Sequence, residues 1–307
     1  MNAELTEIVD GLGKSQKTIS PKYFYDERGS RLFEKITALP EYYLTDAELE
    51  IMRANVDDMA ALIGKHASLI EFGSGSSLKT RILLENLDEL AAYVPVDISQ
   101  EHLWTSAQAI RREFPGLDVI PVVADFTRSF ALPTPTVMPI KNVVYFPGST
   151  IGNFEHDLAT DLLRVMYEEA GKDGALLIGV DLQKDSDIID RAYNDSAGVT
   201  AEFNLNMLRH LNAVYGANFD IDAFEHSAVY DKDEGRVVLE LVSQADQTFE
   251  VGTSQFRIAD GETILTEYSH KYTLEGFAEM AGDAGFTVEK VWTDAAGLFS
   301  VQYCVRN

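Results

Sequence analysis

The stretch SLIEFGSGSSLKTR, residues 68–81, decides the fold class of this chain. A short apolar run, Ser68–Phe72, leads directly into glycines and then into a helix-like stretch that begins at Lys79. A glycine after a strand lets the backbone approach a ligand closely, and the start of the following helix offers free N–H groups. Because ligands of open α/β sheets bind at the carboxyl ends of the strands, this turn predicts a ligand-binding edge.

The same alternation of strand and helix continues downstream of this turn. Four more short, apolar, β-prone runs follow at Tyr93–Val96, Val119–Val123, Val143–Phe146 and Ala175–Val180. The helix-like stretches between them are Lys79–Leu90, Ser99–Phe114 and His156–Ala170. Unbroken apolar strands separated by helices indicate a parallel sheet covered on both faces. The sequence therefore predicts a doubly wound α/β fold.

The alternation stops at about residue 184 and resumes at Thr273. The strands and the helix expected inside this interruption are Arg236–Leu241, Thr248–Arg257 and Val199–Tyr215. Two closely spaced strands at the end of the chain, Thr287–Trp292 and Leu298–Val305, predict an antiparallel closing hairpin. The expected domains are a core of residues 46–183 and 272–307, and a discontinuous α+β domain of residues 1–45 and 184–271.

Composition narrows the partners and the compartment. The 307 residues include 25 Lys and Arg against 50 Asp and Glu, a net charge of −25 that argues against nucleic acid or an anionic membrane as partner. Cys304 is the single cysteine, which excludes an intrachain disulfide and favours a reducing cytoplasm. The first residues do not predict a secretory signal, and no apolar run approaches the length of a membrane span. Cys304 is expected to be an inert core residue.

Acidic and aromatic residues at the ends of the second and third strands point to a nucleoside. Asp97 can accept hydrogen bonds from a ribose diol, although it can equally cap a helix. Asp125 and Phe126 can pair with and stack on an adenine, and a buried Phe beside a capping Asp is the alternative. Leu78 stands where the dinucleotide fingerprint needs its last glycine. S-adenosylmethionine, which has no pyrophosphate, therefore fits better than NAD.

The end of the fourth strand carries the segment Phe146–Phe154, which contains Gly148 and Asn153. Methyl transfer requires the substrate nucleophile to lie opposite the sulfur at this edge, and an Asn amide can orient a polar group there. A glycine-stabilised turn with a left-handed Asn explains the same residues. The residues themselves leave both interpretations open.

The chain as a whole resembles the histidine-specific Nα-methyltransferases of ergothioneine biosynthesis. Segments that match the family, in its order, are Pro21–Asp26, Leu32-Phe33, Leu39–Tyr43, Phe72–Gly75 with Lys79–Arg81, Ala124–Phe126, Gly148–Asn153, Gly198–Asn204 and Leu265–Ser269. The resemblance implies a class I methyltransferase core with a substrate-binding domain. It also implies S-adenosylmethionine-dependent Nα-trimethylation of L-histidine to hercynine, the first step of ergothioneine biosynthesis. Separately from the resemblance, we expect a cytoplasmic protein that is a monomer.

The resemblance also implies roles for individual residues. Those implied to bind the cofactor are Gly73, Lys79, Asp97, Asp125 and Phe126. Those implied to bind the substrate are Asn153 and Tyr193 at the carboxylate, and Glu267 and Ser269, supported by Tyr42, at the imidazole. Tyr25 and Phe33 are implied to line the space around the reacting amine and the cofactor. No metal is expected, because the six histidines lack the spacing of metal ligands.

Two positions depart from the family pattern. Leu239 stands where a Met lines the imidazole pocket, and Asp46 follows Thr45 where an Arg is common. The first departure keeps open a methyltransferase of the same fold that acts on another amino acid or on an imidazole ring nitrogen. A non-catalytic ligand-binding homologue and a nicotinamide oxidoreductase are weaker alternatives, disfavoured by the Glu267/Ser269 pair and by Leu78 respectively.

Overall fold

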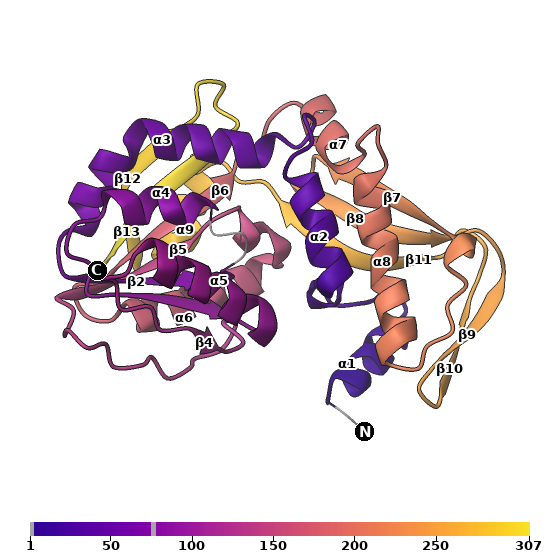
Figure 1. Ribbon diagram of the computed structural model, residues 1–307. Coiled ribbons are helices and arrows are strands. Elements are labelled where there is room, and N and C mark those ends of the chain that lie inside the picture. Colours follow the sequence, from indigo (N-terminus) through magenta and orange to yellow (C-terminus); the bar gives the residue numbers. More distant parts are fainter. Residues whose placement is uncertain (1–2, 75–77) are drawn as a thin grey trace. The chain divides into compact units, whose positions relative to one another are not determined.

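The computed structural model describes residues 3–74 and 78–307 and divides the chain into two compact units (Figure 1). The insertion unit comprises Met1–Tyr43 and Lys184–His270, and the core unit comprises Leu44–Gln183 and Lys271–Asn307. The sequence predicts a division after residues 45, 183 and 271, and the units divide after residues 43, 183 and 270.

The core unit is built on a seven-stranded sheet with the order β12-β13-β6-β5-β2-β3-β4. Its strands are β2 (Ala67–Phe72), β3 (Ala92–Asp97), β4 (Val122–Val123), β5 (Lys141–Phe146), β6 (Ala175–Asp181), β12 (Phe286–Thr293) and β13 (Phe299–Arg306). Neighbouring strands from β6 to β4 are parallel, whereas β13 is antiparallel to both β6 and β12. The predicted doubly wound fold with an antiparallel closing hairpin is confirmed.

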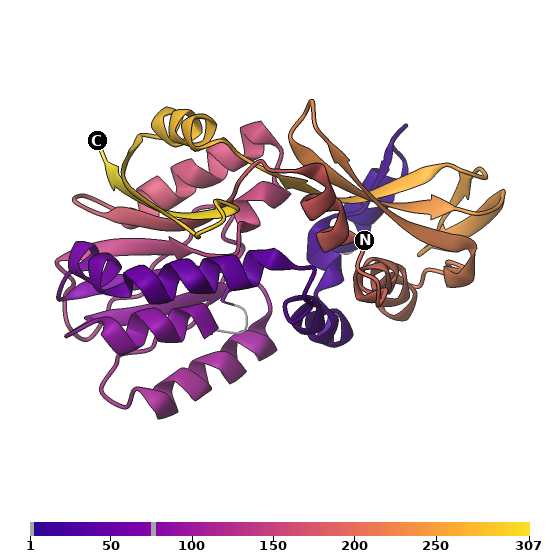
Figure 2. The same ribbon diagram turned by 90° about the horizontal axis from the view of Figure 1, so that it is seen from above.

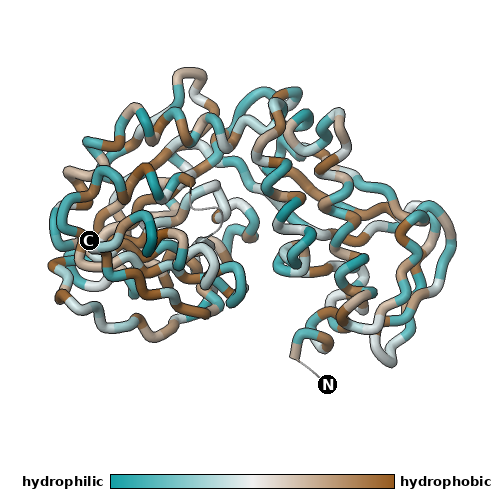
Figure 3. The backbone as a smooth tube through the Cα atoms, in the orientation of Figure 1, coloured by the Kyte–Doolittle hydropathy of each residue, from teal (hydrophilic) through white to brown (hydrophobic). Residues whose placement is uncertain are grey.

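Helices cover both faces of this sheet, as Figure 2 shows. They are α3 (Tyr43–Ile63), α4 (Leu78–Asn86) and α5 (Gln100–Glu113) on one face, and α6 (His156–Ala170) and α9 (Leu274–Asp283) on the other. Successive strand residues point to opposite faces. Ile70 and Phe72 therefore join the core cluster under α6 and α9, and Tyr145 reaches Met52 of α3 on the other face. Hydrophobic residues gather along these strands (Figure 3).

The insertion unit is built on a four-stranded sheet with the order β1-β11-β8-β7. Its strands are β1 (Lys17–Thr18), β7 (Phe224–Asp231), β8 (Arg236–Ser243) and β11 (Thr263–His270), and its helices are α1 (Ala3–Leu12), α2 (Glu27–Ile36), α7 (Ser186–Tyr193) and α8 (Val199–Val214). The side chain of Asp195 accepts the N–H groups of Val199 and Thr200 at 2.8 Å, which caps the start of α8.

The prediction of one strand over Thr248–Arg257 is wrong. The segment forms a two-stranded hairpin, β9 (Gln247–Val251) and β10 (Ser254–Ile258), with an antiparallel register. Gly252 lies in its turn at φ +59°. Both strands are β-prone, so only the glycine, which tolerates a left-handed conformation, signals the reversal.

A β-bulge in β11 decides which side chains of that strand face the helices. Leu265 pairs with Glu240 and Glu267 pairs with Leu239, so Thr266 is the extra residue. Ile264 lies on the buried face, and strict alternation would place Glu267 on the opposite face. Because the bulge adds one residue, Glu267 returns to the buried face with Leu239.

Candidate active site

In the core unit, the carboxyl ends of adjacent strands bring the predicted cofactor residues together. Gly73 follows β2, Asp97 ends β3 and Phe126 follows β4, and β2, β3 and β4 are neighbours in the sheet. The Gly73 N–H donates to the Val96 carbonyl at 2.9 Å, and Gly73 has φ +72°. A Cβ added to Gly73 would lie 3.7 Å from the Phe126 ring. Gly75, the other glycine of the motif, lies outside the described residues.

Asp97 and Asp125 occupy different environments at this edge. Burial raises the pKa of Asp97, and its carboxylate accepts the Ser99 N–H at 2.8 Å. Asp125 is exposed, and one of its oxygens accepts from both the N–H and the hydroxyl of Thr127. Phe126 packs against Phe72 with ring centres 5.6 Å apart. The structure therefore supplies a partly buried acid and an aromatic face at the strand ends.

A buried carboxylate, Glu71 of β2, lies beside the Gly73 turn. Glu71 accepts hydrogen bonds from the Tyr93 hydroxyl and from Thr80 Oγ1, the latter at 2.8 Å. Burial raises the pKa of Glu71 to about 7. The cluster connects β2, β3 and α4, the three elements that frame the Gly73 turn.

A second buried carboxylate, Glu48 of α3, holds Lys79 and the turn after β5. It forms an ion pair with Lys79, and both of its oxygens accept the Gly148 N–H at 3.0 Å. A Cβ on Gly179 of β6 would lie 2.3 Å from Glu48 Oε1, so the glycine leaves the space that the carboxylate fills. The sequence did not identify Glu48, because an acid within an amphipathic helix is expected on its exposed side. Its only signal is an acid among the buried positions of that helix.

The turn that carries Asn153 is anchored to the end of β6. Ser149 adopts φ +57°, and its Oγ accepts the Asp181 N–H at 2.9 Å. The Asp181 carboxylate in turn pairs with Lys271 at 2.8 Å, and both side chains are fully buried. Asn153 ends the 3₁₀ turn Thr150–Asn153 that follows. The predicted Asn153 thus ends a turn whose start, at Ser149, is hydrogen-bonded to the end of β6.

In the insertion unit, a chain of aromatic rings groups the remaining predicted residues. Neighbouring rings meet edge to face at centre distances of 5.8, 6.5 and 6.3 Å, in the order Tyr25, Phe33, Tyr42 and Tyr193. At the end of the chain the Tyr193 hydroxyl lies 2.7 Å from Ser269 Oγ. Aromatic faces of this kind attract a quaternary ammonium group.

Glu267 and Ser269 share one face of β11, two residues apart. Leu239 is the cross-strand partner of Glu267 and is buried, so the residue that departs from the family pattern lies directly beside it. The Thr266 hydroxyl donates to the Leu239 carbonyl at 3.0 Å, which fixes the bulge. An acid and a hydroxyl on this face can accept hydrogen bonds from a ligand N–H.

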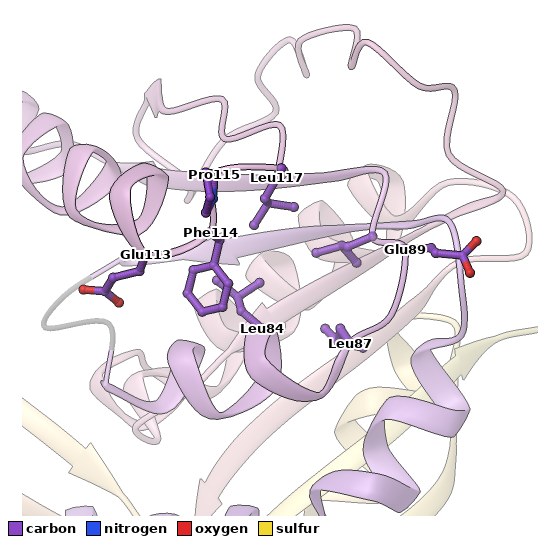
Figure 4. Close-up of a pocket in the computed structure, with 9 residues that line it drawn as sticks. Leu84, Leu87, Glu89, Glu113, Phe114, Pro115 and Leu117 are labelled. Carbon is purple, nitrogen blue, oxygen red and sulfur yellow. The ribbon is translucent and has the colours of Figure 1, made fainter.

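Other features of the chain do not carry the predicted chemistry. Figure 4 shows a hollow at the amino ends of β3 and β4, and none of the predicted site residues lines it. Its lining is Leu84, Leu87, Glu89, Leu90 and Glu113–Leu117.

Among residues 3–74 and 78–307, no three His, Cys, Asp or Glu side chains are grouped as metal ligands. Within the same residues, no helix has the length and hydropathy to cross a membrane.

Comparison with known proteins gives one consistent family. A sequence model described as "Histidine-specific methyltransferase, SAM-dependent" matches residues 4–306. A histidine N-alpha-methyltransferase of Mycolicibacterium smegmatis is 38% identical over 305 residues, 98% of this chain and 94% of the relative. One of Mycobacterium tuberculosis is 37% identical over 307 residues, with the same coverage. Ergothioneine biosynthesis protein 1 of Neurospora crassa is 34% identical over 276 residues, 88% of this chain and 31% of the relative.

Proposed function

This chain belongs to the histidine-specific, S-adenosylmethionine-dependent methyltransferases, and we propose that it trimethylates the α-amino nitrogen of L-histidine. The product is hercynine, and the reaction is the first step of ergothioneine biosynthesis. The observation that carries the choice of substrate is the grouping of Tyr193, Glu267 and Ser269 in the insertion unit.

The carboxyl edge of the core unit fits S-adenosylmethionine, which supplies an electrophilic methyl group when bound. The partly buried Asp97 would accept the ribose hydroxyls, and Phe126 and Asp125 would bind the adenine. Lys79, which pairs with Glu48, would bind the carboxylate of the methionine part. Gly73 has φ +72°, a left-handed conformation that residues with a side chain rarely adopt, so this turn favours glycine. No metal takes part in the proposal.

The insertion unit selects histidine through its imidazole. Glu267 and Ser269 accept or share the imidazole N–H protons, with Tyr42 in support, while Tyr193 binds the carboxylate. For Asn153, which belongs to the core unit, we propose the role in carboxylate binding that the resemblance to the family implies. Tyr25 and Phe33 present aromatic faces to the nitrogen as it becomes a quaternary ammonium, an attraction of about 0.5–2 kcal/mol.

The protein contributes orientation more than proton transfer. The α-amine of histidine must lose a proton before its lone pair can attack, and the proton leaves to water before productive binding. Each of the three transfers forms one N–C bond, breaks one S–C bond and releases one proton overall. Alignment of the amine with the sulfonium contributes several kcal/mol. We propose a monomer acting in a reducing cytoplasm, in keeping with the single cysteine.

Incubation of the purified chain with L-histidine and S-adenosylmethionine tests the function. We expect mass spectrometry to detect the trimethylated product, and NMR to place all three methyl groups on the α-nitrogen. Nτ-methylhistidine and phenylalanine are the comparison substrates. Methyl groups on a ring nitrogen, or turnover of phenylalanine in preference to histidine, would contradict the proposal.

The role of Asp97 predicts the pH dependence of cofactor binding. Asp97→Ala is expected to lower the affinity for S-adenosylhomocysteine about 100-fold, because two hydrogen bonds to a charged acceptor are lost. Burial raises the pKa of Asp97, so wild-type affinity falls as the carboxylate is protonated, at a higher pH than an ordinary Asp requires. Calorimetric titration from pH 8 to pH 5 measures both effects.

Two variants control this experiment. Asp97→Asn keeps the size of the side chain. This variant is expected to bind S-adenosylhomocysteine weakly, with an affinity that does not fall further as the pH is lowered. Asp88→Ala removes an exposed aspartate before the same strand and is expected to bind as wild type does. Equal affinity of the wild type and Asp97→Ala would exclude Asp97 from the cofactor site.

A further inference from the structure

His226 lies on the buried face of β7, which also carries Phe224 and Ala228. Its Nε2 lies 3.0 Å from the Tyr193 carbonyl oxygen, and its Nδ1 lies 2.9 Å from Asn204 Nδ2 of α8. The Asn204 amide also donates to the Glu240 carbonyl at 3.0 Å. The imidazole, which extends from β7, therefore contacts both α7 and α8.

These contacts determine which ring nitrogen of His226 carries the proton. The Glu240 carbonyl accepts a hydrogen bond and so requires the NH₂ group of Asn204 to point toward it. The same NH₂ group faces Nδ1, which must then be an unprotonated acceptor. Because the Tyr193 carbonyl is an acceptor too, the proton lies on Nε2. His226 is a neutral imidazole with one fixed tautomer.

The carbonyl that His226 binds belongs to the last residue of α7. The final carbonyls of a helix have no partner within the helix and need another donor. Tyr193 is also the residue whose hydroxyl lies against Ser269 and whose ring meets Tyr42. One hydrogen bond at its backbone thus fixes the position of a side chain in the aromatic chain.

We propose that His226 is a positioning residue, whose neutral Nε2–H holds the Tyr193 carbonyl and thereby keeps the Tyr193 hydroxyl at the substrate carboxylate. This inference rests on the proposed function, because Tyr193 has its role there. In this proposal His226 acts through Tyr193 rather than by contact with the substrate or the cofactor.

The surroundings of the ring give the arrangement a pH dependence. Burial lowers the pKa of His226, while the Tyr193 carbonyl and the Asp195 carboxylate act in the opposite direction. A further acid, Glu267 of β11, lies on the same face of the sheet as His226. A proton added to Nδ1 would point at the Asn204 NH₂ group. A protonated Nδ1 no longer accepts from Asn204, although Nε2–H stays a donor to the Tyr193 carbonyl. Because burial lowers the pKa of His226, we expect the ring to lose its Asn204 contact and to shift, with a rise of the KM for histidine, only at a pH below the ordinary His pKa of about 6.5.

Two substitutions of His226 separate the effect of its hydrogen bond to the Tyr193 carbonyl from the effect of its size. In His226→Gln the amide nitrogen can donate to the Tyr193 carbonyl, whereas His226→Leu keeps the size and removes the donor. We expect His226→Leu to raise the KM for histidine about 10-fold or more, with S-adenosylhomocysteine affinity unchanged. His226→Gln is expected to stay within about threefold of wild type, and to lose the additional rise of KM at acid pH.

A matched control exists in the same unit. His210 of α8 also places its Nδ1 2.8 Å from a backbone carbonyl oxygen, that of Tyr23. His210→Leu is expected to lower the melting temperature as His226→Leu does and to leave the KM for histidine unchanged. Equal KM values for the wild type and His226→Leu would overturn the proposal. An equal rise of KM in His226→Leu and His210→Leu would do so too, because the effect would then be general destabilisation.

The tautomer can be measured without any activity. Nitrogen-15 NMR of the labelled protein is expected to show His226 with a protonated Nε2 and an unprotonated Nδ1 at pH 7.5. A protonated Nδ1 would overturn the inference, even if the enzyme methylates histidine. If histidine is not a substrate while the NMR pattern is as expected, the proposed function fails and the hydrogen bond to Tyr193 remains.

Discussion

Glu267→Ala is expected to lower kcat/KM for histidine about 1,000-fold while S-adenosylhomocysteine binds as tightly as to the wild type. A site built to bind a polar group loses a factor of this size when one partner is removed, because the imidazole N–H is then desolvated without an acceptor. The cofactor residues belong to the core unit and Glu267 to the insertion unit, so the two effects separate. Steady-state kinetics and calorimetry measure them.

Two further variants sharpen this test. Glu267→Gln keeps the shape and an acceptor oxygen and is expected to retain more activity than Glu267→Ala. Glu225→Ala removes an exposed acid from the opposite face of β7 and is expected to be neutral. Wild-type turnover of histidine by Glu267→Ala would remove Glu267 from the substrate site, and a parallel loss of cofactor affinity would point to misfolding.

Lys271→Met is expected to destabilise the core unit by about 3–5 kcal/mol. The substitution removes the Lys271 ammonium group, which lies 2.8 Å from the fully buried Asp181 carboxylate. Total stabilities of domains are about 5–15 kcal/mol, so we expect a fall in melting temperature of roughly 10 °C. Because the Asp181 N–H also binds Ser149, the Asn153 turn is expected to loosen and the KM for histidine to rise.

An exposed ion pair of the same unit provides the comparison for Lys271→Met. Arg164 and Asp161 of α6 lie 2.7 Å apart with more than half of each side chain exposed. Arg164→Met is expected to cost less than about 0.5 kcal/mol. The double variant Asp181→Asn/Lys271→Met removes both charges and is expected to recover part of the lost stability. No recovery in the double variant would show that the ion pair is not the source of the effect.

The fold of the core unit could be predicted because its signals are local. Each parallel strand is a continuous apolar run, and each turn at the carboxyl edge is marked by a residue with a particular chemistry, as at Gly73, Asp97 and Phe126. The hairpin in the insertion unit could not be separated in the same way, since β9 and β10 are equally β-prone and only Gly252 lies in the turn between them.

The supporting residues of the candidate site escaped prediction for a different reason. Glu48 and Lys79 are 31 positions apart, and no periodicity links a helical acid to a lysine at the start of another helix. From the sequence, His226 cannot be distinguished from the other residues of an alternating strand. Its importance comes from a helix end and an amide that reach it from distant parts of the chain.

The sequence by itself determined the α/β fold class, the family and the residue types of the candidate site. These depend on short apolar runs, glycine turns and motifs that each span only a few residues. The tertiary structure alone decided which of those residues share a surface. One extra residue at Thr266 turns Glu267 to the buried face of β11, and a buried carboxylate joins Lys79 to Gly148. Such contacts depend on strand register and on the packing of distant elements, which local sequence patterns do not contain.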